Sequence, residues 1–175
     1  MTKKSFIAIL VIGLFLTLAG LIVFKALNRK APAEFPEELP AFELFSLEGF
    51  MFTTDLLEAG KTGLVFYGPG CLFCEHKGRE LAKHAADFIG NQFLFITSAP
   101  IDSAIAYSLR TGIGAVPHFY SLVDNFFETP LLFGLRIMPT TLLYDEDRKL
   151  IKGFEGEVNA KTLFKAMHEH GNEKK

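Results

Sequence analysis

The sequence predicts an α/β protein in which helices cover a mixed central sheet to form a three-layer sandwich. Three observations support this fold class. From residue 42 onwards, short segments with the pattern of strands alternate with segments that have the pattern of helices. The strand expected at 62–68 is apolar on both faces, which is typical of a central strand covered by helices. The chain then ends with a β-hairpin and an amphipathic helix.

The beginning of the chain predicts a membrane anchor instead of part of the fold. Residues 5–24 are 20 residues without a charge, and as a helix they would span about 30 Å, the hydrocarbon thickness of a bilayer. A cleaved signal peptide is the alternative, but its apolar region is normally about 7–15 residues long. We therefore expect one N-terminal transmembrane helix within residues 1–30. The basic residues on its two sides are nearly balanced and do not decide its orientation.

A change of composition separates this anchor from the expected domain. Residues 31–41 hold three prolines and three glutamates, which predicts a stiff, polar linker. The domain would then occupy residues 42–175.

The elements of this domain follow one another with recognisable start and stop signals. Glu48 and Gly49 form the turn of the first hairpin, Pro100 and Gly112 lie at the ends of a helix, and Asn159 is the N-cap of the last helix. The expected elements are a hairpin at 42–52, a strand at 62–68, a helix at about 71–89, a strand at 91–98, a helix at 100–112, a strand and turn at 116–125, a hairpin at 140–154 and a helix at 159–170.

Composition excludes some functions. The formal net charge of the 175 residues is −2, and binding to nucleic acid would need a basic patch that the sequence does not show. Glycine-rich loops that hold phosphate groups are not apparent either. Hydrophobic residues make up 49% of the chain, so a core can form without disulfide bonds that hold it together.

Cys71 and Cys74 are the only cysteines in the sequence, and their place in the fold predicts their chemistry. Cys71 lies where a buried strand turns through residues 68–70 into a helix. The unpaired N–H groups of the first helical turn would point at its sulfur and favour a thiolate. Cys74 lies one turn further, on the same helix face, within reach of a disulfide and deeper in the protein. This asymmetry predicts an attacking sulfur and a resolving sulfur.

The cysteine pair has three alternative roles: haem attachment, metal binding and a static disulfide. Haem attachment requires a histidine directly after the second cysteine, where this chain has Glu75. A zinc site needs about four ligands, and Cys71, Cys74 and His76 would supply three. A static disulfide would close a very short loop and would constrain the unfolded chain little. A reversible redox couple is favoured, and a metal site and a static disulfide stay open as alternatives.

Two segments resemble the two halves of the active site of the thioredoxin superfamily. "GLVFYGPGCLFC" is similar to the strand and turn that lead into its C-x-x-C motif, and residues 133–158 are similar to its cis-proline, hairpin and last strand. The 65 residues from Cys74 to Pro139 resemble the TlpA/ResA-like branch, which is membrane-tethered and has an inserted βα unit, here about 91–123. The resemblance covers about residues 42–170.

This resemblance implies the residues that bind substrate. Pro139 would be the cis-proline beside the cysteine pair, preferred over Pro117 because a strand, a turn, a strand and a helix of the right length follow it. Met138 would offer its backbone N–H and C=O to a substrate peptide in β fashion, next to Thr140. The apolar pair Leu72 and Phe73 would form a docking surface, or else pack against neighbouring loops.

The resemblance also implies the function. The protein would be an extracytoplasmic (periplasmic) thiol-disulfide oxidoreductase on the cytoplasmic membrane, without a cofactor beyond the Cys71–Cys74 disulfide. Its partners would be protein disulfides or dithiols and a membrane electron-donor protein, in cytochrome c maturation or disulfide repair. We favour a reductase, because Leu72 and Phe73 offer the thiolate no hydrogen bonds.

The sequence departs from the pattern of this family at three places. Gly70 replaces the usual tryptophan, Val65 stands near the place of the buried acid, and Lys77 stands where many relatives have a glutamate. Glu75 and Lys77 are the candidates for an acid–base or electrostatic role, although Glu75 also suits a first helical turn and Lys77 also suits a solvated face. A second hypothesis is a non-catalytic binding or metal-handling module tethered to the membrane.

Overall fold

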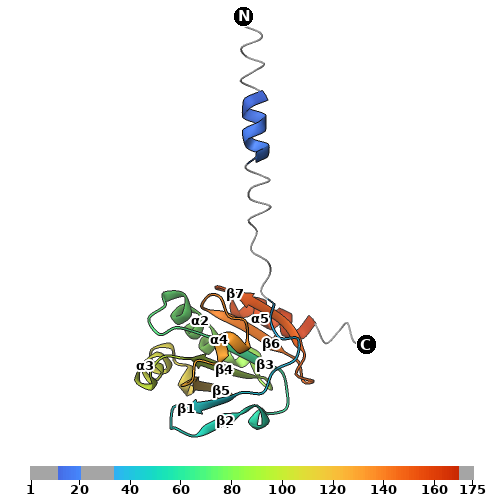
Figure 1. The fold of residues 1–175 in the computed structure, drawn as a ribbon. Helices are drawn as coiled ribbons and strands as arrows, with labels where there is room; N and C mark the ends of the chain where they lie inside the picture. Colours follow the sequence, from blue (N-terminus) through green and yellow to red (C-terminus); the bar gives the residue numbers. More distant parts are fainter. Residues whose placement is uncertain (1–11, 21–33, 170–175) are drawn as a thin grey trace, which may run out of the picture. The chain divides into compact units, whose positions relative to one another are not determined.

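The computed structural model describes residues 12–20 and 34–169, and the chain divides into two compact units, Met1–Pro32 and Ala33–Lys175 (Figure 1). Residues 12–20 are helical. No helix within the described ranges has the length and apolarity that a membrane span requires. The predicted anchor at 5–24 extends beyond the described residues on both sides, so it stays a prediction.

The second unit is built on a mixed sheet of seven strands in the order β2-β1-β5-β4-β3-β6-β7 (Figure 1). The neighbours β3, β4 and β5 are parallel, and the other pairs are antiparallel. The strands are β1 (Glu43–Ser46), β2 (Met51–Thr53), β3 (Thr62–Phe66), β4 (Gln92–Thr97), β5 (Phe119–Val123), β6 (Thr140–Tyr144) and β7 (Leu150–Glu155). The predicted α/β fold with a mixed sheet is confirmed.

Within residues 34–169, four helices accompany this sheet: α2 (Leu72–Lys83), α3 (Ile101–Thr111), α4 (Thr129–Leu132) and α5 (Ala160–Glu169). The helix predicted at 71–89 is shorter than expected, because the chain leaves the α-helix at His84 and continues as a 3₁₀ turn at Ala85–Phe88. Two further 3₁₀ turns lie at Thr54–Leu56 and Ile113–Ala115. The sequence did not predict the four-residue α4.

Alternate residues of the central strands face two separate hydrophobic cores, as a period of two requires. Odd-numbered residues of β3 and β4, such as Val65 and Phe95, pack with α2, α3 and α5. Even-numbered ones, such as Leu64 and Ile96, pack on the other face with Phe133, which follows α4. The three layers are therefore present, but the second outer layer contains only one short helix and irregular chain.

That second layer includes most of the predicted linker. Leu39 is buried in the core of this face, and its N–H donates to Arg148 O at 2.8 Å. Leu150 N–H donates to Glu37 O at 2.7 Å, and the Tyr144 hydroxyl donates to Pro36 O at 3.1 Å. Residues 34–41 therefore belong to the folded domain, because apolar side chains at 35 and 39 bury themselves against the sheet between the prolines.

Candidate active site

The topology of the sheet brings the two predicted halves of the site together. β3 and β6 are antiparallel neighbours, and Phe66 at the end of β3 pairs with Thr140 at the start of β6. The turn that leads to Cys71 and the residue Pro139 therefore lie at the same edge of the sheet. The Met138–Pro139 bond is cis, and it is the only cis peptide bond within the described residues, which decides between Pro139 and its rival Pro117.

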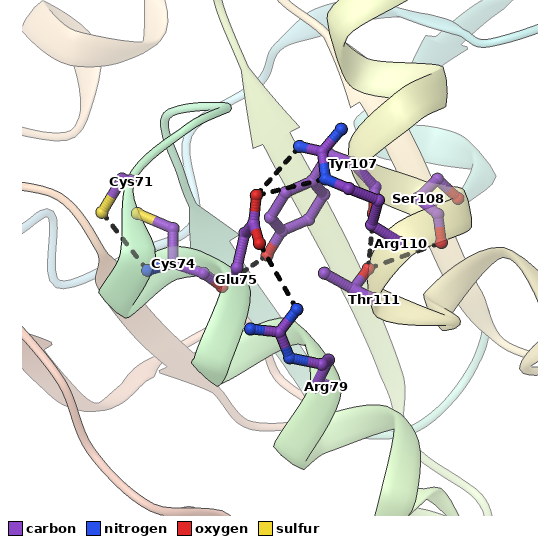
Figure 2. A network of polar contacts seen from close by, with 8 residues as sticks. All are labelled: Cys71, Cys74, Glu75, Arg79, Tyr107, Ser108, Arg110 and Thr111. Atoms are coloured by element: carbon purple, nitrogen blue, oxygen red, sulfur yellow. Dashed lines mark hydrogen bonds and ion pairs between the residues drawn. The ribbon is translucent and has the colours of Figure 1, made fainter.

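Cys71 lies at the N-terminus of α2, as predicted. Gly70 has a φ of 89°, a conformation that favours glycine, and lets the chain turn from β3 into the helix. Cys71 is the N-cap residue, and its Sγ accepts a hydrogen bond from the Cys74 N–H at 3.2 Å (Figure 2). The side chain is partly exposed, and both cysteines are free thiols. The sulfur of Cys71 is therefore accessible and faces the positive end of the helix.

Cys74 differs strongly from Cys71 although one helical turn separates them. Its side chain is 0% exposed. Burial and, to a smaller extent, the hydrogen bond with the Cys71 side chain together raise the pKa of the Cys74 thiol to about 12, against a smaller opposing effect of the Gly68 backbone. Cys74 is thus held as a neutral thiol beside Cys71. The two sulfurs therefore differ in exposure as predicted, and their roles as attacking and resolving sulfur stay a prediction.

Two buried tyrosines line the site, and the sequence did not single them out. Tyr67 follows β3 directly and Tyr107 belongs to α3, and their rings stack with centroids 3.8 Å apart. The Tyr107 hydroxyl donates to Cys74 O at 2.8 Å (Figure 2). The Tyr67 hydroxyl is buried without a hydrogen-bond partner among the described residues. Burial raises the pKa of both hydroxyls, so both stay protonated.

Lys77 does not lie on a solvated face. Its side chain is 1% exposed, and its Nζ donates to Val158 O at 2.7 Å. Burial lowers the pKa of the Lys77 amine to about 8, although Glu80, Glu157 and Cys74 act in the opposite direction. The alternative of a solvated lysine is wrong because α2 turns this position toward the chain that precedes α5.

Glu75 is held by two arginines. Its Oε1 accepts hydrogen bonds from Arg110 Nε at 3.2 Å and Arg110 Nη2 at 3.0 Å, and its Oε2 accepts one from Arg79 Nη1 at 3.3 Å (Figure 2). Arg79 belongs to α2 and Arg110 to α3. The carboxylate therefore connects the two helices.

The predicted docking residues divide into an exposed and a buried group. Leu72, Phe73 and Met138 are 77%, 62% and 40% exposed, in keeping with a docking surface. Thr140 is 0% exposed, and its hydroxyl donates to Ile137 O at 2.7 Å. The Thr140 side chain therefore supports the turn before Pro139 from inside and cannot contact a substrate directly.

The chain from Gly156 to Ala160, between β7 and α5, contacts both halves of the site. Gly156 N–H donates to Pro139 O at 2.8 Å. On the other side, Val158 O accepts the hydrogen bond from Lys77, and Ala160 N–H donates to Glu80 Oε2 at 3.2 Å. We call residues 156–160 the connecting segment. It fixes the cis-proline turn and α2 relative to each other.

His76, the third residue of the alternative zinc set, is exposed and pairs with Glu157 of the connecting segment. Across the part of the chain that the structure describes, no group of three or more His, Cys, Asp or Glu side chains lies close enough to hold a metal ion.

Comparison with known proteins identifies structures that have the same fold as this chain. No protein-family model matches the chain, and no curated protein matches it either. Solved structures do. A secreted Mycobacterium tuberculosis disulfide oxidoreductase homologous to Escherichia coli DsbE is 18% identical with a TM-score of 0.63, over 72% of this chain and 93% of that chain.

Two further structures give the same result. The peroxidoxin BcpB from Mycobacterium tuberculosis is 17% identical with a TM-score of 0.66, over 79% of this chain and 98% of that one. A putative thiol:disulfide interchange protein DsbE from Chlorobium tepidum is 22% identical with a TM-score of 0.59, over 77% and 96%. At these identities the likeness shows the fold, and the chain has the thioredoxin-like fold that these structures share.

Proposed function

We propose that the protein is a thiol-disulfide oxidoreductase that reduces disulfides of other proteins with the Cys71–Cys74 dithiol. One observation carries this proposal: a partly exposed sulfur at the amide end of a helix lies beside a fully buried one. The same edge of the sheet carries Pro139 in a cis bond. The fold that the chain shares with DsbE-like proteins supports the same reaction class.

The reaction has two displacement steps. The Cys71 thiolate attacks one sulfur of the substrate disulfide, forms a mixed disulfide, and releases the other substrate sulfur, which takes up a proton. The Cys74 sulfur then attacks Cys71 Sγ and releases the second substrate thiol. Two electrons pass to the substrate, and the protein is left with a Cys71–Cys74 disulfide. The dithiol is itself the redox centre, so these steps need no bound cofactor.

The site offers a surface for the substrate. The exposed side chains of Leu72 and Phe73 lie next to Cys71 in sequence, and Met138 is exposed directly before Pro139. A substrate peptide would pair with the Met138 backbone as an added strand, and its disulfide would then lie at Cys71.

The cellular setting belongs to the same proposal. The uncharged segment 5–24 would anchor the domain on the outer side of the cytoplasmic membrane, where disulfides form and persist. One of the structures that the fold resembles is of a secreted protein. A membrane electron-donor protein would return the disulfide to the dithiol, in cytochrome c maturation or disulfide repair.

The test is to trap the mixed disulfide. In the full-length chain, Cys74→Ala removes the resolving sulfur, so Cys71 should stay covalently bound to protein substrates in cells. A reducing agent should release these adducts, and Cys71→Ala should abolish them. The purified wild-type protein should also catalyse the reduction of insulin by dithiothreitol.

Two results would overturn the proposal. One is a Cys74→Ala protein that forms no adducts, together with a wild-type protein that does not reduce insulin. The other is a stoichiometric metal ion in the purified reduced protein, which would favour the metal-handling module.

A further inference from the structure

Lys77 and the proposed resolving cysteine, Cys74, are both buried residues of α2. Cys74 and Lys77 are three residues apart, so their side chains lie on the same side of the helix. Long side chains in a helix lean toward its N-terminus, which directs Lys77 back toward Cys74. Both residues are buried, with exposed fractions of 0% and 1%. Because Lys77 is buried, the usual role of a lysine as a solvated surface charge does not explain this residue.

We propose that Lys77 is the proton acceptor for Cys74 in the resolving step, an inference that rests on the proposed oxidoreductase function. The neutral amine takes the proton of the Cys74 thiol and becomes an ammonium group. The Cys74 thiolate attacks Cys71 Sγ, the bond between Cys71 and the substrate breaks, and the substrate sulfur leaves with the electron pair. The ammonium group later returns its proton to solvent or to the leaving thiolate.

The resolving step needs a base because Cys74 is a poor nucleophile as it stands. Only the thiolate attacks a disulfide, and burial holds Cys74 as a thiol, with a pKa raised to about 12. Val65, which lies in the same buried cluster as Cys74, has no group that titrates. Glu75 follows Cys74 directly, but Arg79 and Arg110 occupy its carboxylate.

The surroundings of Lys77 suit an amine that gains and loses a proton. Glu80 on α2, Glu157 on the connecting segment and Cys74 favour the charged form, and burial outweighs them. The hydrogen bond to Val158 O uses one N–H, which the neutral amine also has, and so leaves the nitrogen lone pair available. With a pKa lowered to about 8, roughly one amine in ten is neutral at pH 7.

The titratable groups that face Cys74 from other elements do not take this role. Tyr67 follows β3 and Tyr107 belongs to α3, and burial keeps both hydroxyls protonated. The Tyr107 hydroxyl already donates a hydrogen bond to Cys74 O. A protonated hydroxyl cannot accept the thiol proton as a base, and the amine can.

The two steps can be measured separately in the full-length reduced protein with 5,5′-dithiobis(2-nitrobenzoic acid) in a stopped-flow instrument. The chain has two cysteines. Attack by Cys71 releases one equivalent of thionitrobenzoate, and resolution by Cys74 releases a second. A missing second equivalent in the wild-type protein contradicts the oxidoreductase function itself. The rate of the second phase tests Lys77.

Two substitutions at Lys77 distinguish proton transfer from charge. Lys77→Met removes the base, and Lys77→Arg keeps a positive charge that does not lose its proton. We expect both to slow the second phase by at least about tenfold and to leave the first phase unchanged. Lys83→Met, at the exposed end of the same helix, should match the wild type in both phases. In the wild type, the second phase should rise with pH and level off above about pH 8.

Three results would overturn the inference. They are a Lys77→Met second phase as fast as the wild type, a Lys77→Arg second phase as fast as the wild type, and a wild-type second phase that keeps rising past pH 9. The last of these needs no variant, so the inference stays testable even where a substitution prevents folding.

Discussion

Lys77 keeps its amine inside the domain with the Val158 carbonyl as its hydrogen-bond acceptor. Removing an ammonium group from water costs desolvation free energy, and one hydrogen bond to a carbonyl does not offset this cost. The folded protein therefore binds the Lys77 proton more weakly than the unfolded chain does. A buried lysine of this kind lowers the stability of the fold at neutral pH, which is typical of residues that serve chemistry instead of packing.

This cost gives a stability prediction with a definite sign. The pKa of Lys77 is about 8 in the folded protein, against an ordinary value of 10.5, so the unfolded chain binds more protons between these values. Stability of the wild type relative to Lys77→Met should therefore rise with pH through this window, by about 2–3 kcal/mol between pH 7 and pH 10. Urea unfolding of both proteins under reducing conditions measures the difference. A difference that stays constant with pH would contradict the buried ammonium group.

At the scale of elements, the approach of α2 to α3 depends on one glycine. A Cβ at Gly78 would lie 2.6 Å from the Tyr107 hydroxyl oxygen and 2.9 Å from Thr111 Cγ2. The two helices can therefore come this close only because residue 78 has no side chain. Their close approach lets the Tyr107 hydroxyl donate a hydrogen bond to Cys74 O. The Thr111 hydroxyl donates to Tyr107 O at 2.8 Å, so this hydrogen bond lies within α3 and does not reach α2 (Figure 2).

Gly78→Ala should therefore destabilise the protein, against the usual effect of alanine in a helix. Alanine gains about 1 kcal/mol over glycine in a helix interior, but the clash with α3 should produce a net loss of about 1–3 kcal/mol. Thermal unfolding of the reduced protein measures the change. In a Tyr107→Phe background the nearest clashing atom is absent, so the loss should be smaller. An increase in Tm for Gly78→Ala would show that the helices are not in tight contact.

The elements themselves were largely predictable, because their signals are local. The apolar period, Gly112 after α3 and Asn159 before α5 mark segments that form as expected, and the Thr162 N–H does donate to Asn159 Oδ1 at 2.8 Å. The end of α2 was predicted too late, since neither Gly nor Pro follows Lys83 to stop the helix. The short α4 has too few residues for a period to appear.

The chemistry of the site was only partly predictable, because much of it depends on contacts that are distant in sequence. Cys71, Cys74 and Pro139 could be found from motifs. The burial of Lys77 depends on Val158, which is 81 residues away, and the stacking of Tyr67 on Tyr107 brings together two residues from different elements. No local sequence pattern predicts either contact. From the sequence alone, a lysine in a polar helix is therefore expected on the surface.

At the scale of the whole domain, the second face of the sheet is completed by chain that precedes β1. The Phe35 ring lies over Gly153 of β7, where a Cβ would meet Phe35 Cδ2 at 2.2 Å. Leu39 joins the same core. Residues 34–41 therefore contribute apolar area that the sheet would otherwise expose, and a domain starting at residue 42 would be incomplete.

Substitution within this segment tests its part in the fold. Leu39→Asp places a carboxylate in the core and should lower the free energy of unfolding by about 2–4 kcal/mol. Ala41→Asp makes the same change at an exposed position two residues away and should have little effect. Chemical denaturation of both variants measures the difference. Equal stabilities of the two variants would instead favour the stiff, polar linker that the sequence predicts at 31–41.

The connecting segment has a consequence for the proposed reaction. Gly156 is hydrogen-bonded to the strand edge that would receive a peptide, and Val158 and Ala160 are bonded to the helix that carries the cysteines. In the proposed reaction a disulfide would close at the N-terminus of α2, and the contacts of the connecting segment with Lys77, Glu80 and Pro139 are the path by which a shift of α2 would reach the peptide-binding edge. We therefore expect the two redox forms to differ in their affinity for peptides, so that completing the electron transfer itself loosens the product.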